Sequence, residues 1–123
     1  MKKTILLYKF NEEELKKLKA AILPLKFSAK AVDDAQSDLC VGFLAGAGGD
    51  DTPKKRPDAE MGKLVVMCGL VGGEMDKLLA ALRKAGFSRD VLKAVLTPTN
   101  AQWSGQELYS EILAEHKLMT KKS

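Results

Sequence analysis

Apolar and polar positions follow one another in blocks along the chain, and these blocks predict an order of elements. Residues Thr4 to Phe10 form a near-continuous apolar run with β-branched and aromatic members, which is typical of a strand buried on both faces. Asn11 and Glu14 then form a capping-box pattern that begins a helix, and Pro24 ends it. A second strand is expected near Ser28 to Val32.

The middle of the chain is polar and rich in glycine. Residues 38–45 carry apolar side chains at helical spacing, so we expect a short helix there, although Gly42 weakens it. Residues 46–62 contain a glycine cluster, two prolines and the basic run Lys54-Lys55-Arg56. This composition predicts a flexible linker.

The second half of the chain repeats the order of the first. Residues 63–70 predict a third strand, and Gly86 ends the helix that follows it. A fourth strand is expected from Leu92 to Thr97. Ser104 and Glu107 then form a second capping-box pattern, which begins a final helix.

Both halves therefore predict strand, helix, strand, polar loop and helix. We expect an α/β fold in which a duplicated βαβα unit forms a four-stranded sheet with helices on both faces. The alternative is a ferredoxin-like α+β fold with an antiparallel sheet. In either case residues 1–123 form a single domain, with halves at about 4–45 and 63–119 joined by the linker.

Composition agrees with one soluble domain and narrows the functional classes. The chain has 123 residues, of which 46% are hydrophobic and 29% charged. The apolar run Leu64 to Leu70 is much shorter than a membrane span. Met1-Lys2-Lys3 precedes no long apolar segment, and the two cysteines lack metal-ligand spacing. We therefore expect a cytoplasmic protein with reduced thiols, no metal and no cofactor.

The formal net charge of +4 is a weak indication of a nucleic-acid partner, because it comes from the two ends of the chain. Without its terminal lysines the body of the chain is slightly acidic. The internal basic run Lys54-Lys55-Arg56 has acidic neighbours and no interleaved aromatic residue. Nucleic-acid binding is therefore not expected.

Several strings in the second half resemble a known family. They are Leu64 to Gly69, Leu92 to Asn100, Trp103, and Leu108 to His116. Over about residues 63–119 the chain resembles a short bacterial family catalogued as domain of unknown function 3783. The resemblance implies a small bacterial α/β protein, and it brings no catalytic residues with it.

Cys68 is the strongest candidate for a catalytic residue. It ends a predicted strand shortly before a predicted helix, and a helix N-terminus lowers a thiol pKa. The lone histidine, His116, lies far along the chain, so no base can be assigned to this thiol. A buried, packed Cys68 is the competing interpretation. A thiol-dependent enzyme or redox sensor therefore stays the alternative function.

The loop between the fourth strand and the last helix is the candidate binding surface. It supplies Thr97, Thr99, Asn100 and Trp103 at the carboxyl end of a strand, where ligands of open α/β sheets bind. Turn formation and core packing are the competing roles for these side chains. We expect a non-enzymatic binding or interaction module, whose partner is a small molecule or a protein, a second copy of the chain included.

Overall fold

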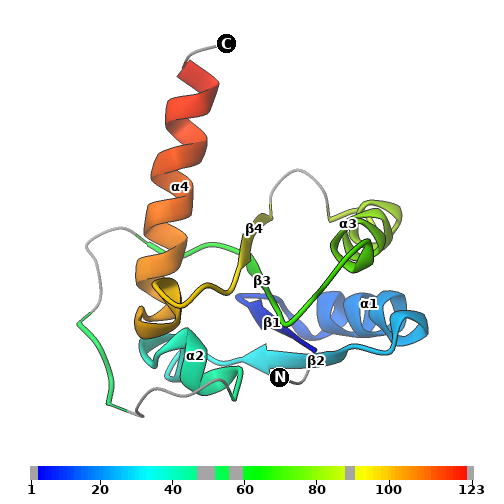
Figure 1. The fold of residues 1–123 in the computed structure, drawn as a ribbon, viewed down its shortest axis with the longest axis horizontal. Coiled ribbons are helices and arrows are strands. Elements are labelled where there is room, and N and C mark those ends of the chain that lie inside the picture. The colour runs from blue at the N-terminus through cyan, green and yellow to red at the C-terminus, as the bar shows by residue number, and fades with distance from the viewer. Residues whose placement is uncertain (1–2, 47–51, 56–59, 88–90, 122–123) are drawn as a thin grey trace.

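The computed structural model describes residues 3–46, 52–55, 60–87 and 91–121, with the side chains of the last helix as far as Glu115 (Figure 1). Within these ranges the strands are β1 (Thr4–Tyr8), β2 (Ser28–Val32), β3 (Leu64–Cys68) and β4 (Leu92–Val95). The α-helices are α1 (Glu12–Ile22), α2 (Val41–Leu44), α3 (Glu74–Lys84) and α4 (Gly105–Lys121). Short 3₁₀ helices are η1 (Leu23–Leu25), η2 (Gln36–Asp38) and η3 (Asn100–Gln102).

The described strands form one mixed sheet in the order β2-β1-β3-β4. Each outer pair, β1 with β2 and β3 with β4, is parallel, because a helix carries the chain back before the second strand of the pair begins. The central pair, β1 with β3, is antiparallel, and Leu6 lies opposite Val66. The predicted α/β fold with a four-stranded sheet is confirmed. The ferredoxin-like alternative is wrong, because its sheet would be antiparallel throughout.

Helices cover both faces of the sheet, as predicted (Figure 1). Alternate side chains of the two central strands pack against α1 and α3, with Ile5 and Met67 among them. The other set, which includes Leu6 and Val66, packs on the side of α2 and α4. Every residue of β1 and β3 is buried, so neither strand needs a polar face. This burial explains why both strands appear in the sequence as unbroken apolar runs.

The element ends differ from the predicted ones for local reasons. The capping box that begins α1 is confirmed: Glu14 N donates to Asn11 Oδ1 at 2.8 Å, and Asn11 N donates to Glu14 Oε1 at 3.0 Å. Strand β1 ends at Tyr8 rather than at Phe10, because Lys9 has a φ of 65° and turns the chain. The short helix expected over residues 38–45 is present as α2, but it begins at Val41 and not at Asp38. Extended backbone at Leu39 separates η2 from α2.

The two halves of the chain contact each other across the centre of the sheet. Residues Leu6 and Val66, sixty positions apart, are directly paired. Two ion pairs cross between the halves, Lys3 with Glu74 and Lys63 with Glu14, and their two lysines, like their two glutamates, are sixty positions apart. Left-handed backbone also recurs at that separation, at Lys9 and Gly69 and at Lys26 and Gly86. Beyond the strands, Cys40 and Ser104 form an isolated antiparallel bridge.

Two further expectations from the sequence concern the linker in the middle of the chain and membrane-spanning helices. The predicted linker stays a prediction, because residues 47–51 and 56–59 of it lie outside the described residues. Within the described residues, no helix has the length and apolar character to cross a bilayer.

Candidate functional site

Cys68 lies at the end of β3 with none of its surface exposed. The alternation of strand side chains directs it to the face covered by α2 and α4, whereas α3 covers the opposite face. The helix that was expected to activate the thiol is therefore on the wrong side of the sheet. Burial raises the Cys68 pKa to about 12, so the thiol stays protonated at neutral pH. The premise of a lowered thiol pKa is wrong.

Thr97 and Asn100 are brought together, but they bond to each other and to the nearby backbone. Thr97 N donates to Asn100 Oδ1 at 2.8 Å, and Asn100 N donates to Thr97 Oγ1 at 3.1 Å. Asn100 Nδ2 also donates to the carbonyl oxygen of Val95 at 2.9 Å. These bonds close the turn between β4 and α4, so the amide is held inside the protein. Thr99 in the same turn is exposed.

Trp103 lies against the core rather than beside the loop surface. Its half-buried ring packs on the apolar cluster between the sheet and α2 and α4. Its carbonyl oxygen accepts a hydrogen bond from Val41 N at 2.8 Å. The residue thus fixes the start of α2 against the turn before α4. Of the four predicted binding residues, Thr99 is exposed and takes no part in the hydrogen bonds between Thr97, Asn100 and Val95.

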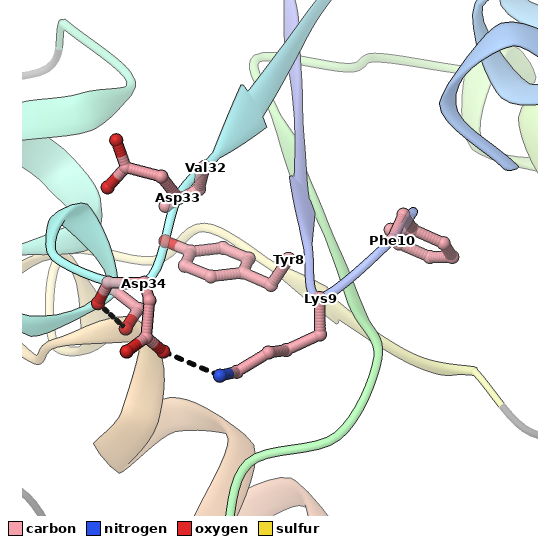
Figure 2. Close-up of a pocket in the computed structure, with 7 residues that line it drawn as sticks. Tyr8, Lys9, Phe10, Val32, Asp33 and Asp34 are labelled. Carbon is pink, nitrogen blue, oxygen red and sulfur yellow. Dashed lines mark hydrogen bonds and ion pairs between the residues drawn. The ribbon is translucent and has the colours of Figure 1, made fainter. Parts of the chain in front are cut away.

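A pocket opens at the carboxyl ends of the other parallel pair, β1 and β2 (Figure 2). It has a volume of about 170 Å³. The residues that line it are Tyr8, Lys9, Phe10, Val32, Asp33, Asp34 and Ser37. The carboxyl end of a parallel pair is where α/β sheets bind ligands. The rule that ligands bind at the carboxyl ends of parallel strands led to the Thr97 loop after β4. The pocket lies instead at the carboxyl ends of β1 and β2.

The Tyr8 hydroxyl is the unusual group of this pocket. Tyr8 is 1% exposed, and its hydroxyl has no hydrogen-bond partner among the described residues. Figure 2 shows the ring directed from β1 toward the segment that carries Asp33 and Asp34. Burial, and to a smaller extent the neighbouring Cys68, raises the pKa of Tyr8 well above its usual value. The hydroxyl is thus a neutral group with a donor and an acceptor to offer.

The ring of Tyr8 is held in place by the beginning of α4. A Cβ built on Gly105 would overlap the Tyr8 ring, so only glycine lets the helix approach so closely. Ser104 caps this helix: Glu107 N donates to Ser104 Oγ at 3.1 Å, which confirms the predicted capping residue. The position of the hydroxyl is therefore determined by the C-terminal half of the chain as well as by β1.

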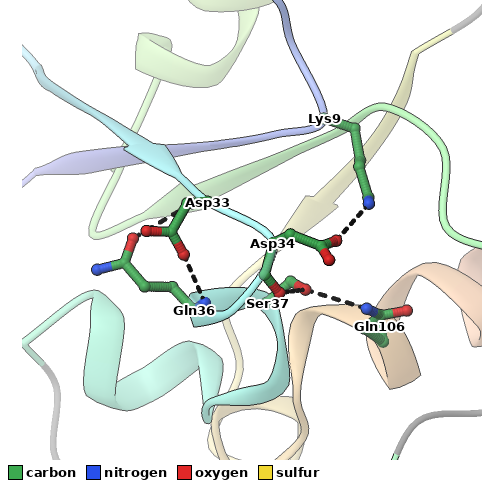
Figure 3. A network of polar contacts seen from close by, with 6 residues as sticks. All are labelled: Lys9, Asp33, Asp34, Gln36, Ser37 and Gln106. Atoms are coloured by element: carbon green, nitrogen blue, oxygen red, sulfur yellow. Dashed lines mark hydrogen bonds and ion pairs between the residues drawn. The ribbon is translucent and has the colours of Figure 1, made fainter.

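Polar contacts fix the loop on the other side of the pocket (Figure 3). Lys9 Nζ donates to Asp34 Oδ1 at 2.6 Å, which joins the end of β1 to the loop after β2. Ser37 Oγ donates to the carbonyl oxygen of Asp34 at 2.6 Å and accepts from Gln106 Nε2 at 3.0 Å. Because Ser37 and Gln106 are both buried, this contact connects the loop to α4 inside the protein.

The same loop contains a second reciprocal turn. Gln36 N donates to Asp33 Oδ1 at 2.7 Å, and Asp33 N donates to Gln36 Oε1 at 3.2 Å. This is the geometry that Thr97 and Asn100 form in the other half. The two turns differ in their setting: a pocket lies beside Asp33, and it is also lined by Tyr8, whose buried hydroxyl has no partner among the described residues.

The chemistry available in this pocket is recognition by hydrogen bonds. One lysine and two aspartates give it a net charge of −1 at neutral pH, and Phe10 and Val32 add apolar wall. In the part of the chain that the structure describes, no cluster of three or more His, Cys, Asp or Glu side chains could hold a metal ion. Among the described residues that line the pocket, no nucleophile is paired with a base.

Sequence reasoning missed Tyr8, Lys9, Asp33, Asp34 and Ser37 as site residues. The signal was present, since Tyr8 ends the first strand and Asp33-Asp34 directly follows the second. Both positions are carboxyl ends of strands that a helix connects, and such strands pair in parallel. The missing information was that the tyrosine hydroxyl is buried beside these aspartates.

The described fold is thus an α/β sandwich with a small polar pocket at one end of its sheet. Residues 63–119 match the model of a family described as Domain of unknown function (DUF3783), so the second half of the chain is similar to this domain. The resemblance expected from the sequence is confirmed over this range. Neither the curated proteins nor the solved structures contained a match to the chain. The pocket lies in the first half, outside the matched residues.

Proposed function

We propose that this protein is a non-enzymatic binding module that holds a small hydrogen-bonding ligand in the pocket between the ends of β1 and β2. The observation that carries the proposal is the Tyr8 hydroxyl, which is buried at the pocket with no partner among the described residues. A buried polar group without a partner destabilises a protein by about 1–3 kcal/mol. A ligand that bonds this hydroxyl recovers that free energy on binding.

The size of the pocket limits the ligand. A cavity of about 150 Å³ accommodates a benzene molecule, so the pocket volume of about 170 Å³ suits a group of about six to eight non-hydrogen atoms. The group needs a donor or an acceptor for Tyr8, and its apolar part would lie against Phe10 and Val32. A free small molecule and the end of a larger molecule both meet this description.

A binding role is favoured over the thiol alternative. Cys68 is fully buried and its pKa is raised, so it is neither accessible nor activated. The free, buried state of Cys40 and Cys68 supports a location in a reducing compartment such as the cytoplasm.

The test is a protein-observed NMR screen of the full-length chain against a library of polar fragments with six to eight non-hydrogen atoms. The expected result is that at least one fragment shifts the amide resonances of Lys9, Asp34 and Ser37 together, because these residues surround the pocket. If fragments bind only elsewhere, or if none shifts these three resonances at millimolar concentration, the proposed function is wrong.

We also propose that the two halves descend from one duplicated βαβα unit. The duplication is supported by the pairing of Leu6 with Val66, by the two Lys–Glu ion pairs between the halves, and by the left-handed residues that recur sixty positions apart. A family model built from relatives of residues 3–45 should align with the model that matches residues 63–119, with the sixty-residue separation over its first part. Failure to align would contradict common descent.

A further inference from the structure

A second recess lies on the opposite side of the sheet from α2 and α4, between α1 and α3. It has a volume of about 550 Å³ and is much larger than the pocket at Tyr8. Its wall is built from small and apolar residues, with Ala21 and Leu25 on the α1 side and Ala80 and Ala81 on α3. Leu23, next to this wall in sequence, is 75% exposed. We call this recess the α1–α3 groove.

The charges at the groove are of one sign. Lys77 and Lys84 line it from α3, and no carboxylate is among the described residues of its wall. Both lysines are exposed, so their ammonium groups are available at the rim. An apolar floor with a cationic rim complements a partner that combines an apolar face with negative charge.

From these features we infer that the α1–α3 groove is the docking site of an acidic amphipathic helix from a partner protein. A helix fits because the alanine side chains let another backbone come close, and because a helix satisfies its own backbone hydrogen bonds. An extended peptide would need a free sheet edge, whereas both walls of this groove are helical.

A second copy of the chain fits the groove less well. In a two-fold symmetric dimer the same surface is presented from both sides, so Lys77 and Lys84 would face the partner's own lysines. Like charges brought together oppose association. The inference is independent of the Tyr8 pocket, which lies at the end of the strands and not on this helical face.

The test uses three 16-residue helical peptides with the same leucine stripe and with glutamate, glutamine or lysine flanking it. Each peptide is titrated into the ¹⁵N-labelled full-length protein. We expect the glutamate peptide to bind tightest and the lysine peptide weakest, with shifts at the amides of Ala21, Ala80 and Ala81. In the double variant Lys77→Glu/Lys84→Glu the order should reverse, with about a tenfold loss of affinity for the glutamate peptide.

The matched control is Lys54→Glu/Lys55→Glu, which changes the net charge equally at a segment outside the groove. It should preserve the peptide order, and amide dispersion of both variants shows whether they fold. The inference is overturned if no peptide binds at millimolar concentration, if the shifts lie elsewhere, or if both variants behave alike. It is also overturned if the protein binds anionic lipid vesicles, but no peptide, in a manner that depends on Lys77 and Lys84. Self-association through these lysines, measured by sedimentation, would overturn it as well.

Discussion

Replacing Tyr8 by phenylalanine removes one oxygen atom and leaves the ring that packs against Gly105. Because that hydroxyl is buried and has no partner among the described residues, Tyr8→Phe should stabilise the ligand-free protein. An unsatisfied buried polar group carries a penalty of about 1–3 kcal/mol. We therefore expect the free energy of unfolding to rise by about 1 kcal/mol or more. For a domain of this size, 1 kcal/mol corresponds to a rise in Tm of about 3–5 °C.

The assay is equilibrium unfolding in urea, followed by tryptophan fluorescence and circular dichroism. Each protein is first unfolded and refolded, so that any ligand carried through purification is removed. Tyr109→Phe is the control, because it removes the same atom from a ring that is only half-buried. If Tyr8→Phe lowers the free energy of unfolding by about 1 kcal/mol, the hydroxyl is bonded in the folded protein. The argument that it is open to a ligand would then be refuted.

Three further predictions test the structural roles assigned above. Asn100→Ala should destabilise the protein by about 2–3 kcal/mol in urea unfolding, because the amide makes two hydrogen bonds inside the turn. Thr99→Ala, at an exposed position, should change stability by less than about 0.5 kcal/mol. Equal effects of the two substitutions would contradict the structural role of Asn100. Cys68 in the folded protein should resist iodoacetamide at pH 8 and react only on unfolding, because burial raises its pKa to about 12; rapid alkylation of the native thiol would overturn this. Bonding to Lys63 lowers the pKa of Glu14 in the folded state, so the stabilising contribution of Glu14 is present above the unfolded pKa and is lost as the pH falls through the folded pKa. Glu14→Gln should therefore flatten the loss of stability below about pH 4.5, the ordinary glutamate value. An unchanged pH profile would contradict the ion pair.

The local order of elements could be predicted because the signals for it are local. Asn11 and Glu14 lie within one turn, and Ser104 and Glu107 repeat the pattern, so both helix starts are encoded by neighbouring residues. The order of the strands could not be predicted in this way. The central pairing joins Leu6 to Val66 across most of the chain, and no nearby residue specifies it. Apolar runs indicate that a strand is buried on both faces, but they do not specify which strand lies next to it.

The candidate site shows the same division between local and distant causes. Thr97 and Asn100 have the chemistry of ligand-binding side chains, but their hydrogen bonds are used within the turn. Only the folded arrangement shows this. Tyr8 looked like one more apolar strand residue, because its burial depends on Gly105 in the other half of the chain. Cys68 was misjudged for a similar reason: strand alternation directs its side chain away from α3.

The most direct test of the binding role is the affinity of the best pocket-binding fragment for three proteins, measured by isothermal titration calorimetry. We expect Tyr8→Phe to weaken binding about three- to tenfold, the factor that corresponds to one hydrogen bond of about 0.7–1.4 kcal/mol. The wild type and Tyr109→Phe should bind equally well. If Tyr8→Phe binds the fragment as tightly as the wild type does, the hydroxyl does not recognise the ligand, and the proposed binding role of Tyr8 is contradicted.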